Sequence, residues 1–383
     1  MRNSSLNRQT GFSILEVLVS IFVILFGLLG IAALMELGRF DAAEANRADR
    51  AGVCGRGALR EVGIREMCDA VWPQGLANPP ARDPKWLQVT LAPYLYGNDN
   101  AGSPPLPYAI PPTPVAIDPL GIAWNQANNP SANAAQLARF PYSADTAHTI
   151  PRITLGMVNA YAPTPAKQQA YFERIFRWQD DLVFAPADAE QSRPRVPGQS
   201  NSPEIEGAYS WLAVVTPMAE ELESVGGVPA IEIDKHRKFQ VSVVVFQKRE
   251  FDPTDPGDQP PSERLVDVTA PTGIAGGDVT LSAASPLKLN IREREWLMLI
   301  GYDKRRVEGT ANMVTVPVVK WYRVVRAGPI EGTSRNVTLA GPDWNKAWNQ
   351  GDVNNDGTPE TPLAAALFTN VVGVYTDTIE VSN

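Results

Sequence analysis

The stretch of sequence that decides the fold is GFSILEVLVSIFVILFGLLGIAALM, residues 11–35. Nearly all side chains from Phe12 to Met35 are apolar. The exceptions are Ser13, Glu16, Ser20, Gly27 and Gly30. As an α-helix this run is about 36 Å long, whereas the hydrocarbon core of a bilayer is about 30 Å thick. The sequence therefore predicts a helix over residues 12–35 that spans a membrane with some tilt.

The residues before this run predict its orientation. Residues 1–11 contain Arg2 and Arg8 and no acidic residue. Basic residues favour the cytoplasmic side of a membrane helix. We therefore expect residues 1–11 to be a cytoplasmic leader, and the chain beyond about residue 36 to be extracytoplasmic.

Two common kinds of segment, a secretory signal peptide and a plain membrane anchor, fit this run less well. A signal peptide has a small-residue cleavage site after its apolar region, whereas Gly11 lies before the apolar run. A plain anchor has no use for Glu16, because a carboxylate in hydrocarbon costs about 2.5–3.5 kcal/mol on insertion scales. This cost indicates that the Glu16 carboxylate has a partner.

The run from Gly11 to Ser20, GFSILEVLVS, resembles the amino-terminal signature of type IV pilins and type II secretion pseudopilins. That signature combines a short basic leader ending in Gly, an aromatic first mature residue, Glu four residues later and a long apolar helix. The resemblance implies that a prepilin peptidase cuts after Gly11 and that Phe12 becomes an N-methylated amino terminus. It also implies that Glu16 acts in assembly, by neutralising the terminal amine of a neighbouring subunit when the helices stack.

The helix, with Gly27 and Gly30, is also similar to that of PilV-type minor pilins and minor pseudopilins. This resemblance implies a single-pass protein of the bacterial inner membrane, with a carboxyl-terminal head in the periplasm, that later enters a pilus or pseudopilus. The implied partners are other pilin or pseudopilin subunits, the prepilin peptidase and the inner-membrane assembly platform.

Residues 36–71 are predicted to continue the helix in amphipathic form, because they contain no Pro and apolar residues recur every three to four positions. These residues are Leu37, Phe40, Ala43, Ala51, Cys54, Ala58 and Val62. Trp72-Pro73 is expected to end the helix. On one straight helix Cys54 and Cys68 are about 21 Å apart, so a disulfide would require a break between them. We expect two small core residues instead.

Residues 72–207 are predicted to be a Pro-rich loop region with one short helix near residues 165–180. Prolines are frequent up to Pro151, so no long regular element is expected there. Thr164 and Pro165 suit the N-cap and the first position of the short helix. Four residues share one face of this short helix, and we expect that face to pack in the core. They are Ala170, Tyr171, Ile175 and Trp178.

Residues 208–383 are predicted to form a β-rich head, because segments rich in β-branched and aromatic residues alternate with Gly, Pro and Asp. The expected strands are Tyr209–Val215, Phe239–Gln247, Arg264–Val268, Val279–Ser282, Trp296–Gly301, Val314–Val325 and Val371–Val381. The predicted fold class is α+β. A long amino-terminal helix packs against an antiparallel-sheet head, which pilin heads resemble, with a large Pro-rich insertion.

The composition argues against several classes of function. The chain has 42 Asp plus Glu against 34 Lys plus Arg, a net charge of −8, so nucleic-acid binding is not expected. Two Cys and two His are too few for zinc fingers, Cys-ligated clusters or a disulfide framework. His148 and His236 have no catalytic motif around them, and we expect no enzyme activity.

A candidate calcium loop begins at residue 352, with the sequence DVNNDGTPE. The candidate oxygen ligands are Asp352, Asn354, Asp356, the carbonyl of Thr358, and Glu360. The loop departs from the EF-hand pattern, because Leu363 stands where a bidentate acid is expected and Pro359 lies inside. The alternative interpretation is an Asn/Asp/Gly turn between two elements.

The expected function is that of a minor pilin or pseudopilin, a structural subunit processed by prepilin peptidase. A head of this size is large for a subunit packed at every helical position, so we expect a role in filament initiation or at the tip. The main alternative is a pilin-delivered surface adhesin or ligand-binding protein, and a weaker one is an anchored hydrolase. Trp344 and Trp348 would suit a partner surface, although core packing is the expectation.

Overall fold

The structure is a computed structural model of the whole chain. The residues that it describes are 13–65, 67–68, 113–129, 133–145, 147–154, 164–178, 208–218, 221–225, 228–230, 238–251, 260–269, 276–307, 313–345, 348 and 363–380. The chain divides into two compact units, residues Met1–Arg50 and Ala51–Asn383.

Helix α1 runs from Ile14 to Ile64, which confirms the predicted long apolar helix. It ends seven residues before the predicted boundary at residue 71. Beyond Ile64 the backbone N–H of Met67 donates to the carbonyl of Val62, and Met67 and Cys68 are both buried. We infer that burial of these two side chains in the core is favoured over continuation of the helix. This is a tertiary effect, which the periodicity of the sequence does not reveal.

Only the last part of the predicted apolar face of α1 is buried. Its buried members are Ala51, Cys54, Ala58 and Val62. Leu37 and Phe40, which belong to the same predicted face, are exposed. Cys54 and Cys68 are both buried, as expected of small core residues, and no disulfide joins them.

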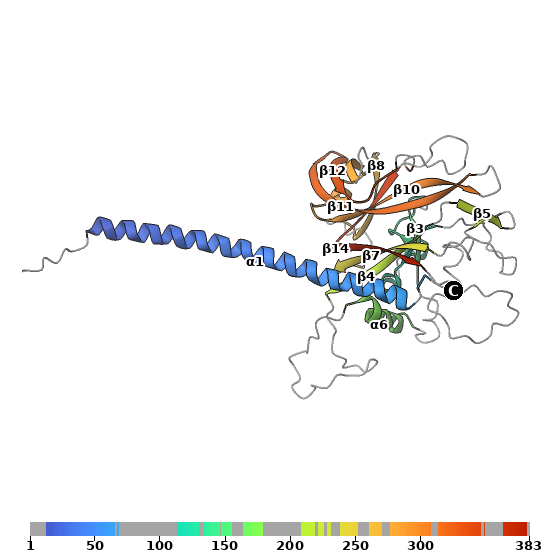
Figure 1. Cartoon of the computed structure of the whole chain (residues 1–383), viewed down its shortest axis with the longest axis horizontal. Helices are drawn as coiled ribbons and strands as arrows, with labels where there is room; N and C mark the ends of the chain where they lie inside the picture. Colours follow the sequence, from blue (N-terminus) through green and yellow to red (C-terminus); the bar gives the residue numbers. More distant parts are fainter. Residues whose placement is uncertain are drawn as a thin grey trace, which may run out of the picture. The chain divides into compact units, whose positions relative to one another are not determined.

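Within the second unit, a six-stranded sheet has the order β14-β7-β4-β1-β3-β2. Its strands are β1 (Val115–Ile117), β2 (Arg139–Phe140), β3 (Ile150–Ile153), β4 (Tyr209–Pro217), β7 (Lys238–Gln247) and β14 (Val371–Glu380). Neighbouring strands are antiparallel except for the parallel pair β1 and β3. Figure 1 shows β4, β7 and β14 between α6 and the strands of a second sheet.

Helices pack on one face of this sheet. They are the end of α1, α3 (Pro119–Asn128) and α6 (Pro165–Phe176), while α4 (Ala134–Leu137) precedes β2. Phe172 and Phe176 of α6 are buried, and the Phe176 ring packs on that of Trp211, whereas Ala170 is exposed. The predicted core face of α6 was therefore partly wrong: Tyr171, Ile175 and Trp178 pack at the margin of the core.

The second sheet closes on itself. Its order is β11-β12-β9-β8-β13-β10-β5-β6, and β10 also pairs with β11. The six strands of the ring are β8 (Glu263–Thr269), β9 (Gly276–Ser282), β10 (Trp296–Val307), β11 (Met313–Glu331), β12 (Ser334–Ala340) and β13 (Leu363–Phe368). All pairs within the ring are antiparallel. Closure pairs the strand edges that an open sheet leaves free.

Apolar side chains fill the inside of this ring. They include Leu297, Leu299, Tyr322, Ala365 and Trp344. Trp348 packs against the same cluster, which confirms the expectation that these tryptophans belong to a core. The 3-10 helix η1 (Pro286–Leu289) contributes Leu289. The remaining strands, β5 (Glu221–Val225) and β6 (Val228–Ala230), extend the sheet beyond β10.

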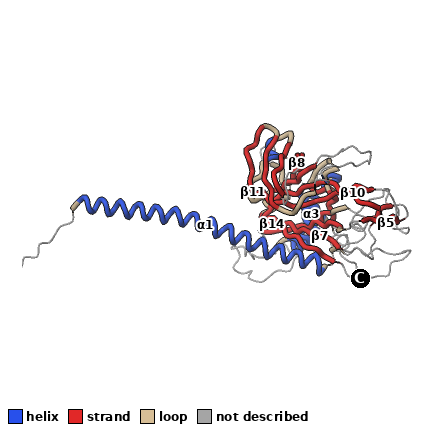
Figure 2. The backbone as a smooth tube through the Cα atoms, turned by 45° about the horizontal axis from the view of Figure 1, so that its top comes forward, coloured by secondary structure: helices blue, strands red, loops and turns tan. Residues whose placement is uncertain are grey.

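A separate apolar cluster joins the two sheets. It contains Phe140 and Val244 from the six-stranded sheet and Ile300, Trp321 and Phe368 from the ring. The Phe140 and Phe368 rings stack with centroids 5.0 Å apart. Figure 2, turned from the first view, again shows β10 and β11 beside β7 and β14. The six-stranded sheet is therefore buried on both faces.

All seven predicted strands exist, so the predicted α+β layout with an amino-terminal helix is confirmed. The expectation of irregular structure was wrong for residues 113–153, which supply β1, β2, β3 and α3 to the core. Proline is compatible with α3 because Pro119 occupies its first turn. Strand β13 was missed because its sequence, LAAALF, has a composition that favours helices.

Candidate functional site

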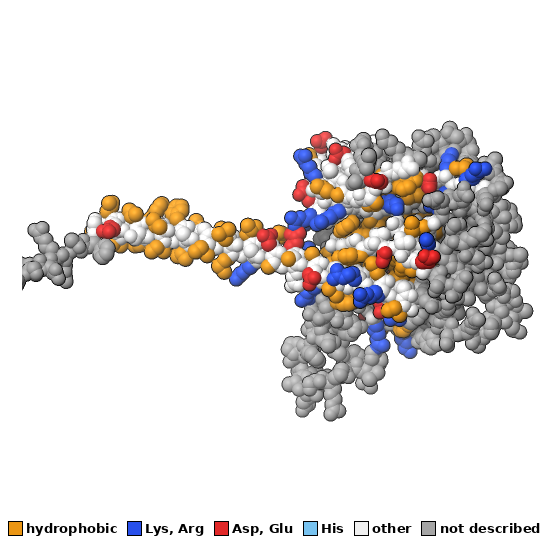
Figure 3. All heavy atoms as spheres, in the orientation of Figure 1, with side chains coloured by type: hydrophobic (Ala, Val, Ile, Leu, Met, Phe, Trp, Pro, Cys, Tyr) orange, Lys and Arg blue, Asp and Glu red, His pale blue; other side chains and the backbone are white. Residues whose placement is uncertain are grey.

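The amino-terminal part of α1 carries a continuous apolar surface. Every residue from Ile14 to Met35 is exposed in the structure, including Leu18, Phe22 and Leu29. Figure 3 shows apolar side chains along this part of the helix. Among the described residues, α1 is the one helix long and apolar enough to cross a membrane. An apolar surface of this extent indicates contact with lipid or with other proteins.

Glu16 lies in the first turn of this apolar segment and is exposed. The backbone N–H of Leu15 donates to the Ser13 hydroxyl at 3.3 Å, and the N–H of Glu16 donates to the Ser13 carbonyl at 3.0 Å, so Ser13 starts the helix. No ion pair joins the Glu16 carboxylate to another described residue. The predicted processing residues, Gly11 and Phe12, lie outside the described residues.

The candidate calcium loop, residues 352–360, also lies outside the described part of the chain. Within the described part, no group of three or more His, Cys, Asp or Glu side chains is placed to hold a metal ion. The calcium site therefore stays a prediction from sequence.

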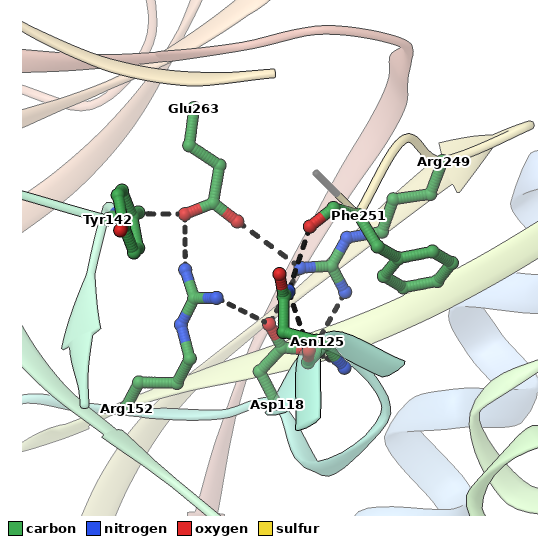
Figure 4. Close-up of polar contacts among 8 residues, drawn as sticks. Asp118, Asn125, Tyr142, Arg152, Arg249, Phe251 and Glu263 are labelled. Carbon is green, nitrogen blue, oxygen red and sulfur yellow. Dashed lines mark hydrogen bonds and ion pairs between the residues drawn. The ribbon is translucent and has the colours of Figure 1, made fainter. Parts of the chain in front are cut away.

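Figure 4 shows a buried charge cluster that the sequence analysis missed. Two carboxylates and two guanidinium groups make up this buried charge cluster, which consists of Asp118, Arg152, Arg249 and Glu263. Their side chains are between 0% and 8% exposed. The charges sum to zero, which is the condition under which ions persist in a protein core.

Asp118 is the centre of the cluster. Both of its carboxylate oxygens accept hydrogen bonds from Arg249. Nη1 donates to Oδ1 at 2.7 Å, and Nη2 donates to Oδ2 at 2.6 Å. Oδ1 also accepts the N–H of Gly121 at 3.1 Å, which caps helix α3. Arg152 Nη1 lies 3.5 Å from Asp118 Oδ2. A bidentate pairing of this kind fixes the position and the plane of both groups.

Glu263 completes the cluster from the first residue of β8. It forms an ion pair with Arg152 and accepts the backbone N–H of Tyr142 at 2.9 Å. Arg249 Nη2 lies 3.4 Å from its other oxygen. The four charges thus connect β1, β3 and the end of β7 in one sheet with β8 in the other.

Burial and charge act in opposite directions on Asp118. Burial alone would raise the pKa of this carboxyl, but the guanidinium groups of Arg249 and Arg152 outweigh it, so the pKa is lowered. In Arg249 burial is outweighed by Asp118 and Glu263, and the pKa is raised. Both groups stay charged at neutral pH. Because each charge is held by the others, the cluster suits a structural joint better than proton transfer.

The separation of these residues in sequence explains why pattern reading missed them. Asp118 and Arg249 are 131 positions apart, and Arg152 and Glu263 are 111 apart. No motif connects them, so only the tertiary structure brings them together.

His148 forms a smaller polar pair with Asp145, with 2.6 Å between His148 Nδ1 and Asp145 Oδ2. Burial would raise the pKa of Asp145, but the bonds from His148 and Ala147 outweigh it, so the pKa is lowered. The His148 ring meets Tyr302 edge to face. Since Asp145 also accepts backbone N–H groups of Ala147 and His148, it organises this turn locally. His236 lies outside the described residues.

Comparison with known proteins adds no family to this picture. A scan of the sequence against protein-family models and a search of curated proteins both find no match. The functional argument therefore depends on the exposed apolar segment of α1 and its single carboxylate.

Proposed function

We propose that the chain is a minor pilin or pseudopilin, a structural subunit of a type IV pilus or a type II secretion pseudopilus. One observation carries this proposal: the exposed apolar segment of α1, residues 14–35, has a carboxylate in its first turn, and that carboxylate has no ion-pair partner among the described residues. A membrane-anchored state alone would leave Glu16 charged in hydrocarbon, at a cost of about 2.5–3.5 kcal/mol.

A filament of packed helices would remove this cost. After cleavage behind Gly11, the N-methylated amine of Phe12 keeps its positive charge. Side-by-side packing then places the amine of one subunit near the Glu16 carboxylate of the next. Two charges that are each unfavourable in an apolar environment neutralise each other, and the pairing favours one axial register.

The proposed location follows from the same helix. The chain is inserted in the bacterial inner membrane with its leader in the cytoplasm and its β-rich head in the periplasm, and is later drawn into the filament. Its partners are the prepilin peptidase, the assembly platform and other pilin subunits. The size of the head favours filament initiation or the tip, and uniform labelling along filaments would contradict this position.

Calcium is proposed as a cofactor of residues 352–360 only. Asp352→Asn with Asp356→Asn should abolish a calcium-dependent rise in the melting temperature of the full chain, since both acids are candidate ligands. Unchanged melting of the parent protein in calcium and in chelator would show that the segment is a turn.

The proposed function is tested by the mature amino terminus and by two variants. Mass spectrometry of native material should show a chain that begins with N-methylated Phe12. Gly11→Ala should block cleavage. Glu16→Gln should be cleaved normally but should fail to co-sediment with filaments, because the amine then has no counter-charge.

Glu36→Gln is the matched control, since Glu36 is also an exposed acid of α1 but lies beyond the apolar segment. It should be cleaved and incorporated like the parent chain. Native protein that begins at Met1, or Glu16→Gln chains that assemble normally, would refute the proposed function.

A further inference from the structure

Strand β14 forms a long open edge of the six-stranded sheet. It has ten residues, Val371–Glu380, and ends the strand order, with β7 as its one strand neighbour in the described part of the chain. Figure 1 shows β14 beside β7. The edge strands β2 and β6 have only two and three residues. Proteins protect sheet edges from other chains by short edge strands or by closure, and β14 has neither protection.

The hydrogen bonds of the neighbouring strands show which backbone groups of β14 face outward. The N–H of Met218, directly after β4, donates to the carbonyl of Lys238 in β7. Because backbone groups alternate in direction along a strand, the even-numbered residues of β7 bond to β4 and the odd-numbered ones to β14. The register pairs these odd-numbered residues with Tyr375, Asp377 and Ile379. The residues of β14 whose N–H and C=O groups point to the open side are therefore Val374, Thr376, Thr378 and Glu380.

The Asp377 carboxylate takes the place of a neighbouring strand at this edge. Its Oδ1 accepts the outward N–H of Thr378 at 2.8 Å. Thr376, Asp377 and Thr378 are all exposed. Glu380 lies 3.9 Å from Lys238, whereas no described cation forms an ion pair with Asp377. The edge thus offers open backbone groups together with one acid that has no counter-charge.

We propose that β14 binds an extended segment of another protein as an additional antiparallel strand, with a lysine or arginine opposite Asp377. A carbonyl of that segment accepts the Thr378 N–H, so the Asp377 carboxylate loses its donor and requires another. In an antiparallel pair Asp377 lies in a non-hydrogen-bonded position, where opposing Cα atoms are only about 4.5 Å apart. A cation there restores the lost interaction. This inference uses the β-rich head alone and does not rest on the proposed function.

Charge at Asp377 disfavours the other two kinds of occupant. If two β14 strands paired antiparallel around residues 376–378, the two Asp377 carboxylates would lie opposite or diagonal to each other, within reach of repulsion. A second copy is therefore a poor partner. Asp377 also shares its face of β14 with Tyr375 and Ile379, which pack against the core. An acid on such a face disfavours a wholly apolar strand, so the edge selects a basic one.

The first test measures the binding of labelled peptides to the full chain in detergent micelles by fluorescence anisotropy. The probe is a capped peptide of about seven alternating valines and lysines, and the comparison peptide has glutamate in place of lysine. The parent chain should bind the lysine peptide about fivefold more tightly than the glutamate peptide, as expected of an exposed charge pair. Asp377→Lys should reverse this preference.

Glu331→Lys is the matched control for the charge change. Glu331 is also an exposed acid of a strand, but it lies at the end of β11 in the other sheet. The substitution changes the net charge of the chain by the same amount as Asp377→Lys. It should keep the preference of the parent chain for the lysine peptide.

The second test separates strand pairing from charge attraction by N-methylation of the peptide backbone. In the proposed antiparallel pairing, valines opposite Thr376 and Thr378 direct their N–H groups to β14, whereas the lysine opposite Asp377 directs its N–H away. N-methylated valines should therefore abolish binding, and N-methylated lysines should leave it unchanged. In the chain, Thr378→Pro removes an outward N–H and no bond to β7. It should weaken peptide binding while the melting temperature stays close to that of the parent.

Three results would overturn the proposal. Equal binding of the lysine and glutamate peptides by the parent chain, or a preference that Asp377→Lys leaves unchanged, would show that Asp377 does not recognise a cation. Valine N-methylation without loss of binding, or equal loss from both methylated peptides, would show that no antiparallel strand is added. A parent chain that is dimeric in micelles, with a monomeric Thr378→Pro variant, would show that a second copy occupies β14.

Discussion

The four buried charges at Asp118, Arg152, Arg249 and Glu263 depend on one another, because each carboxylate is paired with both guanidinium groups and each guanidinium group with both carboxylates. Removing one member leaves a buried charge without compensation. The resulting loss of stability is larger than the stability that the intact pair contributes. The exposed pair Lys238 and Glu380, 3.9 Å apart, has no such dependence because water solvates both ions.

Arg249→Met should destabilise the protein by about 3–5 kcal/mol, because Asp118 loses its bidentate partner while staying buried. Urea unfolding of the full chain, followed by circular dichroism, measures this change. Arg326→Met is the control: Arg326 is exposed on β11, and its loss should change the free energy of unfolding by no more than about 0.5 kcal/mol. Equal effects of the two variants would show that the cluster does not join the sheets.

Stability should also fall in acid because of Asp118. Its pKa is lower in the folded protein than the ordinary value of about 3.9, so its contribution is complete above about pH 4 and is lost as the pH falls through the folded value. Asp118→Asn should remove this part of the pH dependence, giving a flatter plot of unfolding free energy between about pH 4 and pH 2. Parallel plots for the two proteins would contradict the assignment.

At the scale of elements, the end of α1 fits its sheet through glycines. A Cβ atom on Gly55 would lie 2.1 Å from Cδ2 of Tyr375, and one on Gly57 would lie 2.7 Å from Cζ3 of Trp178. These glycines do not break the helix, although each lowers its intrinsic stability. They let aromatic rings from β14 and from the end of α6 contact the helix backbone.

Gly55→Ala should therefore destabilise the protein by about 1–3 kcal/mol, as overpacked core substitutions do. Gly63→Ala is the matched control, because Gly63 is also in α1 but a Cβ there meets no atom within 4 Å. It should stabilise the helix by about 0.5–1 kcal/mol. The melting temperatures of the two variants test these expectations. A Gly55→Ala protein as stable as the parent would show that the Tyr375 side chain moves aside without cost.

At the scale of the whole second unit, two sheets share one core. Phe368 of β13 stacks on Phe140 of β2, and its ring also lies 5.3 Å from that of Trp321 in β11. The buried charge cluster connects the same two sheets. Because they share these apolar and polar contacts, we expect the two sheets to unfold together.

Phe368→Ala should cost about 3–5 kcal/mol and should lower the unfolding temperature of both sheets together. Hydrogen exchange of β4 and β12 amides in the full chain reports each sheet separately. Leu287→Ala, a change at a partly exposed residue of η1, should have little effect. Faster exchange in β12 with no change in β4 would show that the ring unfolds independently.

Much of the layout could be predicted from local signals. The apolar run predicted α1, and β-branched segments predicted seven strands, because both depend on residues that are close in sequence. The pattern failed where local and tertiary preferences differ. The sequence of β13 favours a helix, but its alanines fit inside the closed ring and in the contact between the two sheets. Pro119 lies in a Pro-rich segment, yet it begins helix α3.

The sequence by itself determined a single apolar helix with Glu16 near its start, since hydropathy, length and the position of one acid are linear properties of the chain. Only the tertiary structure decided that Asp118, Arg152, Arg249 and Glu263 meet, that a sheet closes into a ring, and that residues 113–153 belong to the core. The physical reason is that burial and charge compensation depend on distances in space between residues far apart in the chain, and no periodic pattern encodes those distances.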